Sequence, residues 1–389
     1  MPISINDSNF MHKCINEPMI SVKRKNGLLL CDYTPECSQT FNWNEYTLCC
    51  RGIIFEENTG KIIGHGFDKF MNYSELCDDQ SGTLTDRAKL LPKEYQPNIS
   101  GSFEALDKID GSCIITYWYN NDWNTNTRGS FDSDQAHWAY KWLHENININ
   151  NMNKNYTYIF ECVYPDNKIV VDYGDMESLI LIGVRDLSTN DLFYYEKLNG
   201  EAKKLGCNTP KIYTFDSFYD VLKTQSTLSI EREGHVIRFY NGYVCKIKGD
   251  EYCMVHSLIS NVTPLAYWRM YNIETDTINI DMEHFKNIPE EIEKFSIFLI
   301  NTTKEQHISR YEKMKNIYES IPNTLIGRDK YEWMKLNINA DDFKPVMSLV
   351  KNNILYAKKI IHQQLRPTGN KYKDVDLPKR FSHIISETD

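Results

Sequence analysis

The β-hairpin pattern at residues 234–248 is the feature that most constrains how this chain can fold. An alternating run from Gly234 to Tyr240 is followed by Asn241-Gly242 and then by a second run, Tyr243 to Lys248. Asn-Gly between two such runs is a strong short-range signal for a hairpin with a two-residue turn. After about Glu251 no convincing strand alternation follows. The hairpin therefore predicts the last strands of a β-rich domain, with a domain boundary near residues 250–262.

The chain before this hairpin repeats the same kind of pattern, with short apolar runs separated by Asn, Asp, Gly or Pro. Such runs are typical of antiparallel strands joined by turns. A polar start at Asp132 favours a helix through Leu143, and residues 194–225 read as mostly helical. The predicted strands lie within residues 19–33, 48–56, 61–64, 103–128, 156–164, 169–171, 179–184 and 234–248.

The chain after the hairpin has a different character. Amphipathic patterns at residues 288–300 and 303–321 predict helices. We therefore predict an α+β fold in which an antiparallel-sheet-rich domain, residues 1–255, is followed by an all-helical domain, residues 256–389.

Charge excludes a uniformly basic protein, because the chain carries a formal net charge of -9. A nucleic-acid partner would need a local basic patch. Residues 344–380 hold nine Lys and Arg against two Asp. This stretch is either a solvated helix face with a basic tail or a contact to an RNA backbone.

Eleven cysteines without C-x-x-C spacing indicate free thiols in a reducing compartment. The adjacent Cys49 and Cys50 are not expected to serve one metal ion, although a zinc site made from ligands distant in sequence stays open. The first residues lack a signal-peptide pattern, and no apolar run is long enough to span a bilayer. We therefore expect a soluble, cytoplasmic protein without membrane contact.

Lys108 is the first candidate for covalent chemistry, since it lies two residues before the Asp110-Gly111 turn between two predicted strands. A lysine that attacks the α-phosphate of a nucleoside triphosphate must be neutral. Its pKa must therefore fall from about 10.4, and nearby cations with partial burial are the usual cause. Gly111 would let the backbone approach closely after the nucleophile.

Charged residues elsewhere in the β-rich part make sense if they converge on Lys108. Lys246 and Lys248 lie at i, i+2 on one predicted strand and so share a face, where they could counter phosphate charge. Glu161 and Glu233 could hold ribose hydroxyls or a hydrated Mg²⁺. By itself Arg51 reads equally well as an edge-strand residue, and the lone Lys69 reads better as a snorkelling lysine.

In this order and spacing, the short motifs resemble the covalent nucleotidyltransferase superfamily. They are most similar to ATP-dependent RNA ligases of the bacteriophage RNA ligase 1 type. The resemblance covers about residues 45–257. The motifs that carry it are Cys50-Arg-Gly-Ile-Ile-Phe-Glu, Asp68-Lys-Phe-Met-Asn, Lys108-Ile-Asp-Gly-Ser, Thr127-Arg-Gly-Ser, Phe160-Glu-Cys-Val, Glu233-Gly-His-Val and Lys246-Ile-Lys.

The resemblance implies three steps: AMP transfer from ATP to Lys108, AMP transfer to an RNA 5′-phosphate, and displacement of AMP by a 3′-hydroxyl. It implies ATP with Mg²⁺ or Mn²⁺ as cofactors, and single-stranded RNA or broken tRNA loop ends as partners. It further suggests RNA or tRNA repair by a monomer of viral or phage origin. The implied nucleotide-binding residues are Arg51, Lys69, Gly111, Arg128, Glu161 (ribose), Glu233 (catalytic metal), and Lys246 and Lys248 (α-phosphate).

Three positions depart from the pattern of the family. Met71 stands where an aromatic residue is common, Arg128 replaces a lysine, and His235 is less usual than an aromatic residue. Two alternative functions also stay open. A DNA ligase or a GTP-dependent capping enzyme shares the chemistry, but usually adds a β-barrel where this chain reads as helix. A non-catalytic RNA-binding member would be expected to lack one of the catalytic charges, and all are present.

Overall fold

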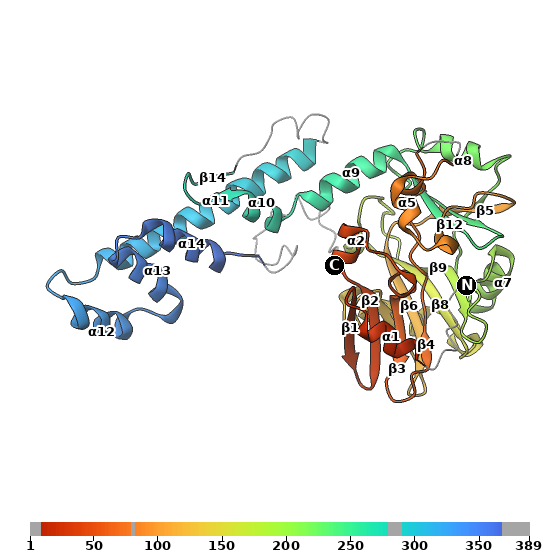
Figure 1. The fold of residues 1–389 in the computed structure, drawn as a ribbon, viewed down its shortest axis with the longest axis horizontal. Helices are drawn as coiled ribbons and strands as arrows, with labels where there is room; N and C mark the ends of the chain where they lie inside the picture. The colour runs from red at the N-terminus through yellow and green to blue at the C-terminus, as the bar shows by residue number, and fades with distance from the viewer. Residues whose placement is uncertain (1–8, 79–81, 279–289, 368–389) are drawn as a thin grey trace. The chain divides into compact units, whose positions relative to one another are not determined.

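The computed structural model describes residues 9–78, 82–278 and 290–367. It divides into two compact units, Met1–Met254 and Val255–Asp389 (Figure 1). The first unit holds the sheets and the second is mostly helical. The predicted α+β class is therefore confirmed.

The first sheet has the order β1-β2-β3-β4, with β1 at Ile20–Lys25, β2 at Leu28–Tyr33, β3 at Arg51–Glu56 and β4 at Ile62–Gly64. All of its pairings are antiparallel. The β1-β2 turn uses Asn26 and Gly27, whose φ angles of 49° and 79° suit these two residue types. The hairpin predicted within residues 19–33 is confirmed.

The second sheet has the order β10-β5-β11-β12. Its strands are β5 (Phe103–Lys108), β10 (Ile212–Tyr213), β11 (Gly234–Phe239) and β12 (Val244–Lys248). The β11-β12 pair is the hairpin predicted from Asn241-Gly242, and its register places β11 between β5 and β12. Strand β5 thus lies beside a hairpin that is far from it in sequence.

The third sheet has the order β7-β6-β8-β9, with β6 at Ser112–Tyr119, β7 at Asp122–Thr127, β8 at Tyr156–Val163 and β9 at Ser178–Asp186. Helix α6 (Asp134–Asn146) contacts β6, β7 and β9, and α7 (Tyr195–Leu205) packs on β9. Ser133 caps α6 by accepting a hydrogen bond from the Ala136 amide.

Separate apolar clusters hold these layers together. Leu28, Leu30 and Ile54 of the first sheet pack with Tyr117 of the third, so the two sheets share a core. Each fully buried aliphatic side chain of this kind contributes about 1.5–3 kcal/mol. The remaining helices of the first unit are α1 (Phe10–Asn16), α2 (Pro35–Thr40), α3 (Glu45–Cys49), α4 (Tyr73–Leu76), α5 (Asp86–Leu90) and α8 (Phe218–Thr224), with 3₁₀ turns at Lys93–Tyr95, Ile149–Asn151 and Pro165–Asn167.

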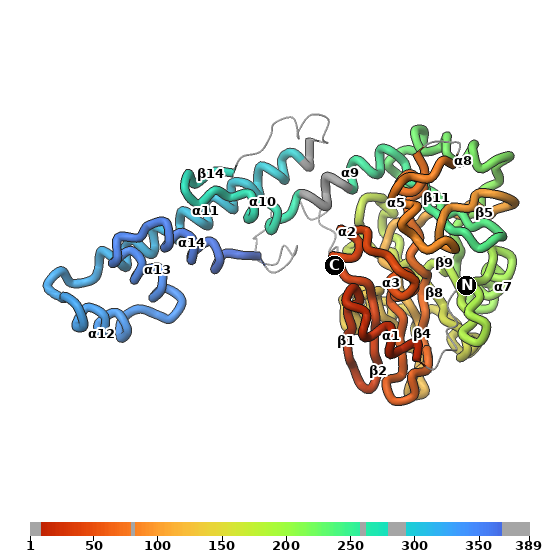
Figure 2. Tube along the Cα trace, in the orientation of Figure 1, coloured from red at the N-terminus to blue at the C-terminus, as the bar shows by residue number. Residues whose placement is uncertain are grey.

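The second unit is built around the long helix α11 (Glu290–Glu319), as Figure 2 traces. Its core joins Met314 and Ile321 to Met334, Val346 and Ile361. The boundary between the units falls inside α9 (Asp250–Asn261). The other elements are α10 (Pro264–Met270), β13 (Tyr271–Asn272), β14 (Thr277–Ile278), α12 (Gly327–Asn337), α13 (Ala340–Val350) and α14 (Ile354–Gln364).

Local hydrogen bonds explain two wrong strand predictions. Residues 48–49 end helix α3, because Asn44 and Thr47 form a capping box that starts a helix there. Residues 169–171 form no strand, and the amides of Val170 and Val171 donate to the Asp110 carboxylate instead.

Three predictions for other segments were incomplete. The two helices expected at 288–300 and 303–321 form one helix, α11, over the residues described there. Residues 194–225 contain the short strand β10 between α7 and α8, and β13 pairs with β14 in the helical unit. Of the described helices, none is both long and apolar enough to cross a membrane.

Candidate active site

Lys108, Glu233 and Lys248 meet at the end of the second sheet. Gly234 lies opposite Lys108 on one side and opposite Lys248 on the other, so the register sets both lysines beside the residue that precedes β11. The Glu233 carboxylate accepts hydrogen bonds from Lys108 Nζ at 2.6 Å and from Lys248 Nζ at 2.8 Å. One carboxylate that is 3% exposed therefore joins two ammonium groups.

The protonation of Lys108 differs from the sequence-based expectation. Burial acts to lower the pKa of Lys108, but the carboxylates of Glu233 and Glu161 outweigh it and raise the pKa above its usual value. Burial acts to raise the pKa of Glu233, while Lys108 and Lys248 bring it below its ordinary range. The ligand-free site thus holds Lys108 as an ammonium ion paired with Glu233.

Lys246 is the lysine whose pKa falls. It shares a face of β12 with Lys248, and its amide donates to the Met71 carbonyl at 3.1 Å. Burial, followed by repulsion from Lys108, Lys69, Lys248 and Arg51, lowers the pKa of Lys246 well below its usual value. Crowded cations of this kind would be relieved by an anionic ligand.

Lys69 and Arg128 extend the positive charge along the first sheet. Lys69 Nζ lies over the rings of Tyr33 and Trp43, 5.4 and 5.3 Å from their centroids. Arg128 follows β7, pairs with Asp32 at 3.0 Å and donates to the Tyr33 hydroxyl at 2.6 Å. Lys69 thus lies over the rings of Tyr33 and Trp43, and Arg128 lies over the ring of Tyr33. Cation–π contacts of this kind stabilise positive charge.

Arg51 opens β3 opposite Asp32. Burial acts to lower its pKa, but Cys113, Tyr33, Asp32 and Glu161 raise it, so the guanidinium stays charged. Burial raises the pKa of Asp32 to about 6 despite the opposing effects of Arg128 and Arg51.

Glu161 on β8 is the second carboxylate of the site. It is buried, and within the described residues its side chain forms no hydrogen bond or ion pair. Burial raises the pKa of Glu161 to about 7, although Lys108 and Arg51 pull it down. Carboxylate oxygens are the ligands that Mg²⁺ and Mn²⁺ prefer, so Glu161 and Glu233 fit a divalent cation.

Two glycines let the backbone pass close to these groups. A Cβ on Gly111 would lie 2.5 Å from the Cys162 carbonyl oxygen and 3.1 Å from Glu161 Cγ. A Cβ on Gly234, whose φ is +148°, would lie 2.0 Å from the Ile247 carbonyl oxygen. Both positions therefore require glycine.

Side chains distant in sequence fix the turn after Lys108, and sequence alone does not reveal them. The buried Asp110 carboxylate accepts hydrogen bonds from the amides of Val170 and Val171, both at 2.9 Å, and from the Tyr252 hydroxyl at 2.7 Å. The Asp110 amide donates to the Tyr173 hydroxyl. Asp110 was visible in sequence only as a turn former, and nothing in the sequence marks Tyr173 or Tyr252.

All nine predicted site residues lie in the described part of the chain. The interactions above link them into one network. Glu233 contacts Lys108 and Lys248 directly. Lys246 interacts by charge with Lys108, Lys69, Lys248 and Arg51, and Glu161 interacts by charge with Lys108 and Arg51. Gly111 lies against Glu161, and Arg128 pairs with Asp32, which faces Arg51. Their proximity is observed, and their individual roles stay predictions.

Two of the departures noted in sequence are buried side chains. Met71 is 4% exposed and packs in an apolar cluster with Tyr33 and Trp43. His235 pairs with Asp107 and Ile247, on the sheet face opposite Lys246, and its buried ring nitrogens have no hydrogen-bond partner among the described residues. Burial lowers the pKa of His235 to about 4, which keeps the ring neutral.

Comparison with known proteins adds a family. The model of a family described as RNA ligase matches residues 49–252, slightly more than half of the chain. A protein described as a bifunctional polynucleotide kinase/RNA ligase, from Autographa californica nuclear polyhedrosis virus, is 29% identical over 264 residues. An RNA ligase from Rhodothermus phage RM378 is 22% identical over 276 residues.

These relatives are matched only in part. The first match covers 61% of this chain and 35% of the viral protein, and the second covers 56% of this chain and 62% of the phage protein. Among solved structures, an RNA ligase mutant of Naegleria gruberi with ATP and Mn matches 40% of this chain and 51% of its own, at 15% identity and a TM-score of 0.33. A likeness this low adds nothing to the assignment.

Proposed function

This chain belongs to the RNA ligase family, and we propose that it is an ATP-dependent RNA ligase that works through a lysyl-AMP intermediate on Lys108. The observation that carries the proposal is the pair of contacts from Lys108 and Lys248 to Glu233, with Lys246 crowded by cations beside them. Ion pairs that serve only to stabilise a fold do not need a surplus of buried positive charge. A site that binds a triphosphate needs such a surplus, because the triphosphate carries about four negative charges.

The first step joins Lys108 Nζ to the α-phosphorus of ATP and breaks the bond from that phosphorus to the pyrophosphate oxygen. Lys108 must first give up the proton that Glu233 helps to hold. In the ligand-free site, burial and neighbouring cations lower the pKa of Lys246. Negative charge on a bound phosphate would raise the pKa of Lys246 again, because it favours the protonated amine. We assign Lys246, Lys248, Arg51 and Lys69 to phosphate binding.

Glu233 and Glu161 are the residues assigned to a divalent cation, Mg²⁺ or Mn²⁺. When bound, the cation would neutralise phosphate charge during AMP transfer. Glu233 is the partner that keeps Lys108 protonated in the ligand-free site, so loss of this contact would free the Lys108 amine for attack. Glu161 is also the residue assigned to the ribose, and Gly111 and Arg128 line the same nucleotide site.

The second and third steps would move AMP from Lys108 to an RNA 5′-phosphate and then release it as a 3′-hydroxyl attacks. The helical unit is proposed to choose the RNA, with broken tRNA loop ends as one candidate. The exposed cations of its described part support this: Lys344, Lys351, Lys359 and Arg366. Lys371, Lys373, Lys379 and Arg380 of the same basic stretch lie outside the described residues.

The expected cellular context follows from the thiols and the relatives. All eleven cysteines lie in described segments, and none of them forms a disulfide. We propose a monomeric intracellular enzyme of viral or phage origin, acting in RNA or tRNA repair.

Labelled nucleotides test the reaction directly. The purified chain is incubated with Mg²⁺ and either α-labelled ATP or α-labelled GTP, and the adduct is then chased with 5′-phosphorylated RNA or DNA strands. We expect a covalent, ATP-derived adduct that survives alkali but is released by acid, as a phosphoramidate is, and that 5′-phosphorylated RNA discharges to ligated product. Lys108→Ala should abolish the adduct, whereas Lys89→Ala, at an exposed lysine of α5, should leave it intact.

Each alternative has its own outcome. A GTP-derived adduct would identify a capping-type enzyme, and transfer to DNA but not RNA would identify a DNA ligase. If neither nucleotide labels the folded chain with Mg²⁺ or Mn²⁺, the chain is a non-catalytic member of the fold and the proposal is wrong.

A further inference from the structure

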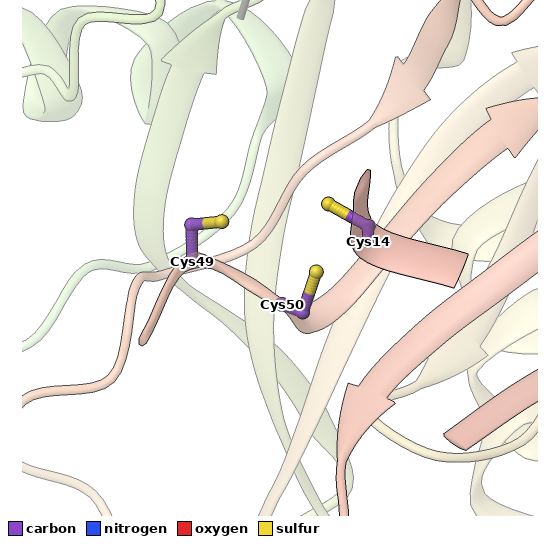
Figure 3. Close-up of side chains that lie close together, drawn as sticks. All are labelled: Cys14, Cys49 and Cys50. Carbon is purple, nitrogen blue, oxygen red and sulfur yellow. The ribbon is translucent and has the colours of Figure 1, made fainter. Parts of the chain in front are cut away.

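Three thiols from separate parts of the sequence meet inside the first unit. Cys14 lies on α1, Cys49 ends α3, and Cys50 is the C-cap of that helix. Their sulfur atoms all lie within 4.8 Å of one another, and the residues are 0%, 5% and 0% exposed. In Figure 3 the three side chains are directed into a common space.

The helix end explains how adjacent cysteines can share this space. In a strand, neighbouring side chains point to opposite faces and could not readily share one ion. At Cys50 the chain instead leaves α3 with φ −79° and ψ 80°, before β3 begins at Arg51. The expectation that this pair is unsuited to a single ion is therefore wrong on geometry.

We propose that Cys14, Cys49 and Cys50 form a structural site for one thiophilic divalent cation of the Zn²⁺ class. Zn–S bonds of about 2.3 Å separate two sulfurs in a tetrahedral site by about 3.8 Å, a spacing that the 4.8 Å limit allows. Within the described residues, the group contains sulfur ligands alone. Thiolates select soft ions over Mg²⁺ and Ca²⁺.

The surroundings favour a divalent over a monovalent ion. The three cysteines belong to an apolar cluster with Phe10, Ile53 and Phe55. For any given number of thiolates, a divalent ion leaves one negative charge fewer in this cluster than Cu⁺ does, and so has the lower desolvation cost. Tetrahedral zinc needs a fourth ligand.

Cys31 is a candidate for the fourth ligand, although it lies outside the group of sulfurs that are within 4.8 Å of one another. It is fully buried in the same cluster and interacts electrostatically with Cys14 and Cys49. Ion binding would release the thiol protons and tie α1 to the point where α3 passes into β3. Arg51, assigned to phosphate binding, is the residue that follows this point.

Metal content gives the first test. The full chain is purified from zinc-supplemented culture without chelator, and bound metal is measured by mass spectrometry. We expect about one zinc ion per chain, retained through gel filtration. Exchange with Cd²⁺ should add an ultraviolet thiolate-to-cadmium absorption band, which carboxylate-bound cations at Glu161 and Glu233 cannot produce.

Variants then locate the ion. Cys14→Ala should lose the cadmium band, and Cys50→Ala should do the same. Cys245→Ala removes a fully buried thiol from a different apolar cluster and should keep the band unchanged. Cys31→Ala should weaken cadmium binding at least about tenfold if Cys31 is the fourth ligand, and the three-cysteine site stands without it.

The wild-type measurements decide the matter even if these variants fail to fold. A folded chain that contains no zinc and shows no cadmium band on titration with Cd²⁺ would overturn the proposal. So would a native disulfide between any two of Cys14, Cys49 and Cys50, detected by peptide mass spectrometry. An intact band in both Cys14→Ala and Cys50→Ala would place the ion elsewhere.

Discussion

Glu233→Gln should destabilise the ligand-free chain by about 3 kcal/mol, because it removes one charge and leaves two lysines without a partner. The carboxylate contacts Lys108 at 2.6 Å and Lys248 at 2.8 Å, and the two lysine side chains are 21% and 17% exposed. A hydrogen bond to a charged group contributes about 1.5–3 kcal/mol, and breaking a buried pair costs about 3–5 kcal/mol. The lower end applies here, since both lysines keep some water contact. The Tm should fall by about 6–12 °C.

Urea denaturation without nucleotide or metal measures this free energy directly, with tryptophan fluorescence as the signal. The pKa of Glu233 is lowered in the folded state, so its contribution is present above its unfolded value near 4.5 and is lost as the pH falls through the folded pKa. The pKa of Lys108 is raised above 10.5, so its contribution persists below that pH. The difference between wild type and Glu233→Gln should therefore shrink in acid, and it is best measured above pH 8, where Glu161, with a pKa of about 7, is ionised.

A double-mutant cycle with Lys248→Met separates lost attraction from general damage. If unpaired ammonium charge causes the loss, the double variant should be more stable than the sum of the single effects predicts, by about 1–2 kcal/mol. Asp86→Asn, which breaks the exposed pair with Lys89, is the control and should leave the urea midpoint unchanged. Additive effects, or a Glu233→Gln midpoint equal to that of wild type, would refute the reasoning.

Three further results are expected. Burial raises the pKa of Glu161 to about 7, so the folded state binds the Glu161 proton more tightly than the unfolded state does. The free energy of unfolding should therefore fall by about 2–3 kcal/mol as the pH rises from 4.5 to 7. Urea titrations at a series of pH values should show this decline in the wild type and not in Glu161→Gln. Tyr252→Phe deletes the 2.7 Å hydrogen bond to the buried Asp110 carboxylate. It should lower the free energy of unfolding by about 1.5–3 kcal/mol in the same assay and slow adduct formation with labelled ATP. If neither value changes, Tyr252 does not hold the turn. Gly111→Ala should prevent adduct formation and lower the Tm, since its Cβ would lie 2.5 Å from a carbonyl oxygen. The control Gly200→Ala, at a helical position with open space around it, should raise stability by about 0.5–1 kcal/mol. Equal Tm shifts in the two variants would show that small movements of the backbone remove the clash at Gly111.

Local sequence signals were sufficient where the structure is made locally. Asn26-Gly27 and Asn241-Gly242 both form the turns that their residue types favour, and the strands on either side follow. Strand prediction was wrong where a distant side chain competes for the backbone. Val170 and Val171 look like strand residues, but their amides donate to Asp110, 60 and 61 residues earlier in the chain.

The order of the proposed site residues along the chain was enough to suggest that they lie together, whereas their electrostatics could not be predicted. The spacing of Lys246 and Lys248 correctly predicts a shared face. It cannot tell which lysine is crowded by cations and which is paired with a carboxylate, because that depends on the register of β11 with β5 and β12. The lowered pKa expected for Lys108 is therefore found on Lys246. The cluster of Cys14 with Cys49 likewise depends on packing between distant segments.

The position of Tyr252 on the first turn of α9 affects how this protein can be shortened. Every charged residue assigned to the nucleotide lies at or before Lys248, so a truncation there would look harmless in an alignment of motifs. Such a chain would nevertheless lose the hydroxyl that donates to Asp110 and the ring that lies 5.0 Å from Lys248 Nζ. An isolated catalytic fragment should therefore end no earlier than Met254, where the first compact unit ends.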